Sequence, residues 1–332
     1  MEVEIYTDES YFQDKKTKKV YIGIGCLFVP TNFKEKMSKD LSNLRCLNGS
    51  CSQWSWKIGK CNINDNICKE KWHNYNNCEI HYKKLSNSSS QASKKISKRW
   101  IEYLVNYNRK NLDTENLIYF KILYLDCSKL DMSEFGDEKT QNIIYNRFYR
   151  SMILGVRKYF FTGQYFSIKE FFHDKSDDKE SDNIFPWHAP SKLEEMKDFN
   201  IQKEEISFID SNHKEYSENQ DKINSQFIQF IDLILGCSNQ ILFRLSNDKM
   251  KKELANDYYP LFKRLWEHPK NPNSSYNYYR KQDISIFPKD KIRDQEDLYH
   301  ELTRLEGQYH RNIKIREIRQ ENESGPLDRY FS

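Results

Sequence analysis

The sequence predicts an α/β fold, in which one domain of alternating strands and helices carries appendages. Apolar runs of strand length, such as residues 20–29 and 117–125, alternate with longer stretches whose apolar residues recur at helical spacing. No internal repeat divides the 332 residues, and a chain of this length can bury a sizeable core. These observations favour a sheet flanked by helices.

Composition excludes several classes of protein. The net charge of +4 creates no global field that would draw the chain onto nucleic acid, so any such binding would depend on local basic patches. No apolar run reaches the roughly 18 to 20 residues of a membrane span, and the acidic N-terminus is unlike a secretory signal. Because the chain has eight cysteines and no such signal, we expect a cytoplasmic protein without a membrane partner.

The first ten residues predict a strand that leads into two acids. Apolar and polar side chains alternate over residues 2–7, as on a strand with one covered face. Asp8, Glu9 and Ser10 follow, and no Lys or Arg stands beside them in the sequence. A carboxylate at the end of a buried strand is costly unless it is solvated, paired or bound to a cation. The segment is therefore either a solvated hairpin turn or a metal ligand at a sheet edge.

Further elements are expected in order along the chain. Helices are predicted over residues 31–45, with Thr31 as N-cap, and over 91–108, 138–160, 225–245 and 248–267, with a charged helix from about residue 290. Strands are predicted over 20–29, 117–126, 166–174, 205–210 and 284–287, and residues 79–85 form a short alternating segment. Residues 1–245 then form the main domain with a Cys-rich insertion at 46–78, and residues 246–332 form a C-terminal, largely helical extension packed on it.

Several predicted elements carry an acidic residue at a position that is expected to be buried. Four predicted strands end in Asp8, Asp126, Asp174 and Asp210. Asp232 stands inside an apolar helix, so it is either a ligand or an aspartate bonded to a buried backbone amide. Carboxylates that meet at one sheet edge repel one another unless cations such as Mg²⁺ or Mn²⁺ bind them. Two such ions can clamp the phosphate in a phosphoryl transfer.

Five short motifs, taken together and in order, resemble one protein family. They are Thr-Asp8-Glu9-Ser10, Glu79-Ile-His81, Phe-His-Asp174, Ile-Asp210-Ser211 and Ile-Gln229-Phe-Ile-Asp232-Leu-Ile. The pattern resembles the bacterial family called domain of unknown function 3800, of the ribonuclease H-like superfamily, over roughly residues 1–290. Tyr11 departs from the pattern, since glycine is usual there and Tyr11 is expected to narrow the turn after Glu9. The insertion at 46–78 is a second departure.

The resemblance implies a ribonuclease H-like mixed sheet with a central parallel part, flanked by helices. It also implies a nuclease site that binds two Mg²⁺ or Mn²⁺ ions and acts on a nucleic acid. Carried over residue by residue, Asp8 would bridge the ions, and Glu79 and Asp174 would each hold one. Asp232 would close the site from its helix.

The resemblance also implies residues that support these ligands. Glu9, His81 and Gln229 would orient the ligands or the substrate. Gln229 lies three residues before Asp232, so both share one face of the predicted helix. Asp126 is the alternative to Asp174, because a ribonuclease H-like order is expected to place residues 117–126 beside the first strand.

The Cys-rich insertion and the tail offer competing signals. The insertion holds Cys46, Cys51, Cys61, Cys68 and Cys78, without the C-x₂-C pair of common zinc sites, so reduced thiols are expected and zinc is the alternative. Residues 276–281 interleave aromatic and basic side chains, as single-strand binders do, although tyrosines packed on the domain explain them equally. Residues 311–319 carry basic side chains that are either solvated or contact a protein partner or a second copy of the chain.

Two functions of different classes follow from these residues. The first is a metal-dependent nuclease that hydrolyses phosphodiester bonds of DNA or RNA by water attack, with no covalent intermediate. The alternative is a catalytically silent ribonuclease H-like module that binds nucleic acid or a protein partner, in phage defence or a mobile element. An active site should bind Mn²⁺ and be stabilised by it, whereas a silent one should not.

The cysteine spacing makes a prediction about metal content. If the five cysteines are reduced thiols, purified protein should contain well under one zinc per chain, measured by elemental analysis after dialysis. A stoichiometric zinc that resists dialysis would contradict this and would make residues 46–81 a metal-stapled substrate-binding subdomain.

Overall fold

A computed structural model of the chain describes most of the first 287 residues. The described residues are 1–14, 17–45, 78–110, 116–130, 140–161, 165–175, 193, 200–212, 219–267 and 281–287. The Cys-rich residues 46–77, the tyrosine-rich residues 276–280 and the charged helix expected from about residue 290 lie outside them.

The described strands form one mixed sheet of seven, in the order β5-β4-β1-β2-β3-β7, with β6 also paired to β4. They are β1 (Glu2–Gln13), β2 (Val20–Pro30), β3 (Tyr119–Asp126), β4 (Ser167–Asp174), β5 (Asn200–Ile201), β6 (Ile206–Ile209) and β7 (Gln282–Phe287). The pairs β1–β2 and β2–β3 are antiparallel, whereas β4 runs parallel to β1, β5 and β6, and β7 runs parallel to β3. The prediction of an α/β fold is therefore confirmed.

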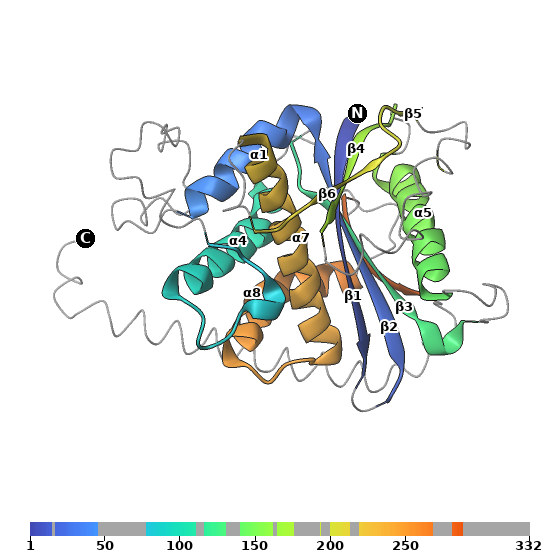
Figure 1. The fold of residues 1–332 in the computed structure, drawn as a ribbon. Helices are drawn as coiled ribbons and strands as arrows, with labels where there is room; N and C mark the ends of the chain where they lie inside the picture. The colour runs from blue at the N-terminus through green and yellow to red at the C-terminus, as the bar shows by residue number, and fades with distance from the viewer. Residues whose placement is uncertain are drawn as a thin grey trace.

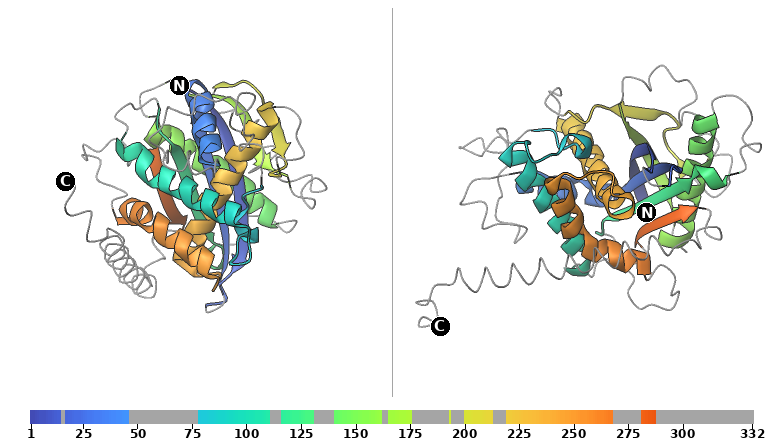
Figure 2. Two further views of the ribbon diagram at one scale, coloured as in Figure 1. Left: turned by 90° about the vertical axis from the view of Figure 1, so that its left-hand side faces the viewer. Right: turned by 90° about the horizontal axis from the view of Figure 1, so that it is seen from below.

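Helices cover both faces of the sheet (Figures 1 and 2). On one face lie α1 (Thr31–Leu44), α4 (Gln91–Lys110), α7 (Asn219–Phe243) and α8 (Lys249–Glu267), whereas α5 (Thr140–Phe160) covers the other face. Two short 3₁₀ helices, η1 (Tyr82–Lys84) and η2 (Cys127–Lys129), follow residues 78–81 and β3. Each face of the sheet has its own hydrophobic core. Side chains of α8 and β7 belong to the same core as those of α7, and β7 also pairs with β3 in the sheet.

The central helix of the larger layer is α7. Its apolar side chains, including Ile231 and Leu235, are buried against β1 and β2. Among the described residues, its segment Asp221–Phe243 alone is long and apolar enough to cross a membrane, but 89% of its most apolar window is buried inside the protein. Such burial is consistent with the core helix of a soluble protein.

The structure corrects several details expected of the N-terminal strand. Strand β1 continues through Asp8 to Gln13, so no turn follows Glu9 and Tyr11 pairs with Ile22 within the hairpin. Both faces of the strand are covered, and Glu4, expected on an open face, is only 2% exposed. The alternation over residues 2–7 therefore separates an apolar buried face from a more polar buried face, and neither face is exposed to solvent.

Two further local expectations differ from the structure. Pro30, not Thr31, stands at the N-cap of α1, and no side chain caps that helix end. Residues 79–85 contain a 3₁₀ turn at η1, since Lys84 N–H donates to the carbonyl oxygen of His81 at 3.0 Å. Alternation over so short a segment cannot separate a strand from a turn.

Gly236 of α7 lies directly under the Tyr82 ring of η1, which gives a stability prediction. A Cβ at this position would lie 2.1 Å from Cγ of Tyr82, at the base of a ring that cannot rotate away. We therefore expect Gly236→Ala to lower the free energy of unfolding by about 1 to 3 kcal/mol in urea titrations, the usual cost of overpacking.

Gly155 of α5 provides the matched control. No atom of the described residues lies within 4 Å of a Cβ built there. Gly155→Ala should therefore stabilise the protein by about 0.5 to 1 kcal/mol, because alanine restricts the unfolded chain and favours the helix. Equal stabilisation by both substitutions would show that Tyr82 does not pack on α7 in solution.

Candidate active site

Asp8 lies in the middle of β1 on the face covered by α7. Its direct partner in β2 is Gly25, where a Cβ would touch Ile231 and Leu235 of α7. Opposed residues of antiparallel strands project from the same face, so Asp8 also faces α7. The pairing of β1 with β4 ends at Thr7 and His173, so Asp8 directly follows the last residue of β1 that pairs with β4.

Asp174 ends β4 next to this position, and its carboxyl group has a raised pKa. Burial, followed by the charges of Asp232 and Asp210, raises its pKa to about 6, against the opposing charges of His173 and His81. Its Oδ1 is buried, and among the described residues no hydrogen-bond donor reaches that atom. Asp174 is therefore a buried carboxyl group that holds its proton more tightly than an ordinary aspartate.

Asp232 of α7 holds the segment that precedes and begins η1. Its Oδ2 accepts a hydrogen bond from Tyr82 N–H at 2.5 Å and lies 3.0 Å from Nδ1 of His81. Burial lowers the pKa of His81, but the hydrogen bond and charge of Asp232 outweigh burial and raise it. Asp232 thus bonds a backbone amide, as one reading of the sequence held, and also contacts a predicted site residue.

Gln229, one turn before Asp232, fixes the same segment from the other side. Its Oε1 accepts hydrogen bonds from Ile80 N–H at 2.9 Å and from Arg45 Nη2 at 2.7 Å. Its Nε2 donates to the carbonyl oxygen of Ser211 at 2.6 Å. Gln229 is fully buried and therefore positions backbone that carries Glu79 and His81.

Arg45 is a buried contributor that the sequence did not reveal. Its guanidinium donates to the carbonyl oxygen of Cys78 at 2.8 Å and to Gln226 Oε1 at 3.0 Å, and lies 4.7 Å from the centre of the Trp100 ring. Burial lowers its pKa to about 10. An arginine at the end of an amphipathic helix gives no sequence signal of such burial.

Glu79 lies at the rim of the group and has its own cation. Its Oε2 accepts from Lys84 Nζ at 2.6 Å, and its Oε1 accepts from Ser211 Oγ at 3.2 Å. Glu79 and Asp232 therefore have basic partners, Lys84 and His81. Those bases stand five and two residues after Glu79, in a turn that the sequence did not predict.

Glu9 and His173 lie behind the site, on the α5 face of the sheet. His173 Nε2 is 3.0 Å from Glu9 Oε2 and 3.3 Å from the Tyr145 hydroxyl, and its Nδ1 is 3.0 Å from the Asp174 carbonyl oxygen. Burial lowers the pKa of His173 to about 4. Glu9 therefore supports the ends of β1 and β4 from the opposite face to Asp8.

Asp126 is not part of this group. It pairs with Tyr21 near the hairpin end of β2, and β2 separates its strand from β1. Its Oδ1 accepts from Ser128 N–H at 3.1 Å and so caps η2. The strand-order expectation that favoured Asp126 is wrong, because β4 and not β3 lies beside β1 on the side away from β2.

The described residues fit a divalent cation only in part. Asp8, Asp174 and Asp232 face one region and offer carboxylate oxygens, the donors that Mg²⁺ and Mn²⁺ prefer. The buried, unbonded Oδ1 of Asp174 is an oxygen to which a cation would be favourable. As the side chains stand, however, no three acidic, histidine or cysteine groups among the described residues converge closely enough to hold an ion.

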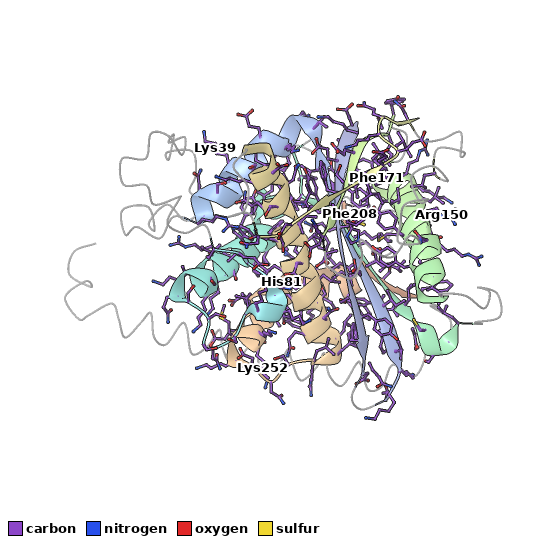
Figure 3. All side chains as sticks on the ribbon, viewed as in Figure 1. Lys39, His81, Arg150, Phe171, Phe208 and Lys252 are labelled. Atoms are coloured by element: carbon purple, nitrogen blue, oxygen red, sulfur yellow. The ribbon has the colours of Figure 1, made fainter. Side chains whose placement is uncertain are left out.

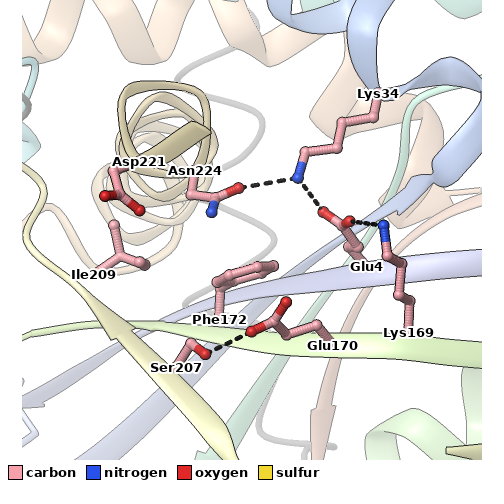
Figure 4. A pocket seen from close by; sticks show the side chains of 9 residues that line it. All are labelled: Glu4, Lys34, Lys169, Glu170, Phe172, Ser207, Ile209, Asp221 and Asn224. Carbon is pink, nitrogen blue, oxygen red and sulfur yellow. Dashed lines mark hydrogen bonds and ion pairs between the residues drawn. The ribbon is translucent and has the colours of Figure 1, made fainter. Parts of the chain in front are cut away.

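A second polar cluster lines a cavity of about 390 Å³ near the start of β1 and α7 (Figure 4). Glu4 is bonded there to Lys34, Tyr6 and Lys169, and Asn224 accepts from Lys34 at 3.0 Å. Two lysines thus neutralise the buried Glu4, which indicates a structural role for these three residues.

No protein-family model matches this chain, and a search of curated proteins finds none similar to it.

The raised pKa of Asp174 predicts the pH dependence of stability in the metal-free protein. The folded state binds the Asp174 proton with a pKa of about 6, against the ordinary value of 3.8. The stabilisation from this proton is therefore complete below about pH 4 and is lost as pH rises through 6. Asp174→Asn should gain about 3 kcal/mol on wild type between about pH 4 and pH 8, at about 1.4 kcal/mol per pKa unit.

Urea unfolding in the presence of a chelator measures this difference. A variant whose free energy of unfolding differs from wild type by the same amount at every pH would show that Asp174 titrates normally.

Proposed function

We propose that the protein is a divalent-metal-dependent nuclease that hydrolyses phosphodiester bonds of DNA or RNA. The observation that carries the proposal is Asp174, whose Oδ1 is buried and unbonded among the described residues and whose carboxyl group interacts electrostatically with Asp232 and His81. A buried carboxylate with a raised pKa and acidic neighbours is a typical feature of a functional site. It costs folding stability, so its presence favours function over architecture.

The topology supports a ribonuclease H-like assignment. The resemblance to domain of unknown function 3800 implies a mixed sheet with a parallel centre, flanked by helices. Strands β1, β4 and β6 provide such a parallel part, and β2 and β3 extend it in antiparallel fashion. The motif acids Asp8, Asp174 and Asp232 come from the central strands and from the helix that crosses them.

Three carboxylates would hold the metal in this proposal. Asp8, Asp174 and Asp232 are the ligands, and Glu79 would join them on release from Lys84. Mg²⁺ or Mn²⁺, when bound, supplies the positive charge that activates water and offsets charge on the phosphate. Because the carboxylates repel one another less when neutralised, binding should also stabilise the fold.

His81 and Gln229 would support the reaction in different ways. The Nδ1 of His81 donates to Asp232, which leaves Nε2 to hold a proton for the leaving oxygen of the substrate. The hydrogen bond and charge of Asp232 raise the pKa of His81 and so favour the protonated ring. Gln229 is a positioning residue, since it fixes the backbone between Glu79 and His81.

The catalytically silent module remains the alternative, and the ion pairs favour it. His81 is paired with Asp232 and Lys84 is paired with Glu79, so two of the four predicted ligands already have a basic partner. Such pairs would suit a protein that keeps the fold and binds nucleic acid or a protein partner without cleaving. A Mn²⁺-dependent rise in melting temperature would favour the nuclease, whereas its absence would favour the module.

Asp8 and Asp126 form a matched pair for testing the nuclease. Both are buried aspartates on strands paired with β2, opposite Gly25 and Tyr21, with exposed fractions of 6% and 2%. Asp8→Asn should reduce cleavage by more than about 100-fold, because loss of even an outer-shell partner of a metal site costs 10- to 100-fold. Asp126→Asn should retain cleavage, since Asp126 caps η2 away from the site.

Cleavage of labelled DNA and RNA, single- and double-stranded, with Mg²⁺ or Mn²⁺ provides the measurement. The melting temperature of metal-free Asp8→Asn should equal or exceed that of wild type, because carboxylate repulsion is relieved. Unchanged cleavage by Asp8→Asn would remove Asp8 from the mechanism. Equal loss in both variants would assign the effect to folding.

A further inference from the structure

The turn that carries His81 continues into a lysine-rich surface built from two segments. Asn87 N–H donates to Asp248 Oδ2 at 3.0 Å, and Met250 N–H donates to Asn87 Oδ1 at 3.1 Å. Lys251 Nζ donates to the carbonyl oxygen of Lys83 at 3.1 Å. These reciprocal bonds hold residues 82–90 against the start of α8, so the two segments present one surface.

This surface, called here the η1 surface, carries an excess of positive charge. Its lysines are Lys83, Lys84, Lys94, Lys95, Lys249, Lys251 and Lys252. The carboxylates among them are already engaged: Asp248 caps α8 by accepting from Met250 N–H at 2.8 Å, and Glu253 pairs with Lys98 and Lys249. Lys83, Lys249 and Lys252 are exposed, so their charges reach the solvent.

The η1 surface adjoins the candidate active site through Tyr82 and Lys84. Tyr82 donates its N–H to Asp232, and its ring lies 5.1 Å from Lys251 Nζ. Lys84 reaches back to Glu79 at 2.6 Å. Figure 3 shows His81 level with the middle of α7 and Lys252 below it, whereas Lys39 lies at the other end of the helical layer.

The helix geometry adds to the positive potential of this surface. Both α4 and α8 begin here, and Ser90 Oγ accepts from Ser93 N–H at 3.1 Å at the start of α4. Helix N-termini carry partial positive charge, which adds to that of the lysines. Exposed Ser88 and Ser90 supply hydroxyl donors of the kind that contact phosphate oxygens.

We propose that the η1 surface binds the phosphodiester backbone of a nucleic acid beside the candidate active site. The proposal rests on the nuclease assignment, because that assignment makes the neighbouring acids act on the same polymer. Lysines bind phosphates as point charges without reading bases, so the contact is independent of sequence. It also offsets the acidic site, which would otherwise repel a polyanion.

The test uses the full-length chain with Asp8→Asn, so that bound substrate is not cleaved. In this background, Lys83→Gln, Lys251→Gln and Lys252→Gln are combined and binding to a fluorescein-labelled oligonucleotide is measured over a range of salt. Each lost phosphate contact lowers the slope of log K against log salt by about 0.7 to 0.9. The triple variant should therefore lose about 2 to 3 from that slope and bind less tightly at moderate salt.

A second triple variant controls for net charge. Lys36→Gln, Lys39→Gln and Lys158→Gln remove the same charge from exposed positions on α1 and α5. This variant should keep the slope of its parent. Equal loss in the two triple variants, or no loss in the η1 variant, would overturn the proposal.

Two further outcomes separate this inference from the nuclease assignment. If the slope falls as expected but the chain with Asp8 intact cleaves no polymer, the η1 surface stands and the nuclease assignment fails. If the chain with Asp8 intact cleaves a polymer while the η1 variant binds normally, the nuclease assignment stands and the proposal for the η1 surface fails. Displacement of the oligonucleotide by polyglutamate at equal charge concentration would overturn the proposal in favour of an acidic protein partner.

Discussion

Two side chains of α7, Gln229 and Asp232, hold the backbone of residues 80–82, and the geometry of the candidate site depends on that grip. Each accepts a backbone N–H from the turn, and both lie on one helix face because they are three residues apart. A turn held at two points by a buried helix has few alternative conformations. Glu79 lies just before the held segment, and His81 lies within it. Both residues therefore approach the carboxylate group from a fixed direction.

This arrangement trades folding stability for local charge. Burying carboxylates near one another disfavours their ionised forms, and at Asp174 the penalty is only partly offset by His173 and His81. The hydrogen bonds of Asp232 show the opposite solution, in which a backbone amide and an imidazole satisfy the same oxygen. The group thus contains one carboxylate with hydrogen-bond partners, Asp232, and one whose buried Oδ1 has none among the described residues, Asp174. Of the two, Asp174 would bind a cation more favourably.

Most of the secondary structure could be predicted from the sequence, because apolar periodicity is a local property. The predicted helices at 91–108 and 248–267 and the strand at 166–174 differ from the observed ones by one or two residues. The strand order could not be predicted in the same way, since it depends on contacts between distant segments, and a wrong strand order was the reason that Asp126 stood as the alternative to Asp174.

The candidate site could be predicted only in part for a related reason. Asp8, Asp174 and Asp232 were identifiable because acids in apolar surroundings are unusual, and the structure brings them to one face. Arg45, Lys251 and the turn at Tyr82 gave no comparable signal, because arginine, lysine and tyrosine are ordinary on surfaces. Their importance comes from partners more than 30 residues away, such as Gln229 for Arg45.

The bond between Arg45 and the Cys78 carbonyl has a consequence for how this chain can change over evolution. It joins the residue before the excursion at 46–77 to the residue after it, so the chain leaves and re-enters the core at almost the same point. The closure entropy of such a loop grows only with the logarithm of its length. A change in the number of residues between Arg45 and Cys78 should therefore alter the entropic cost of bringing these two residues together by little.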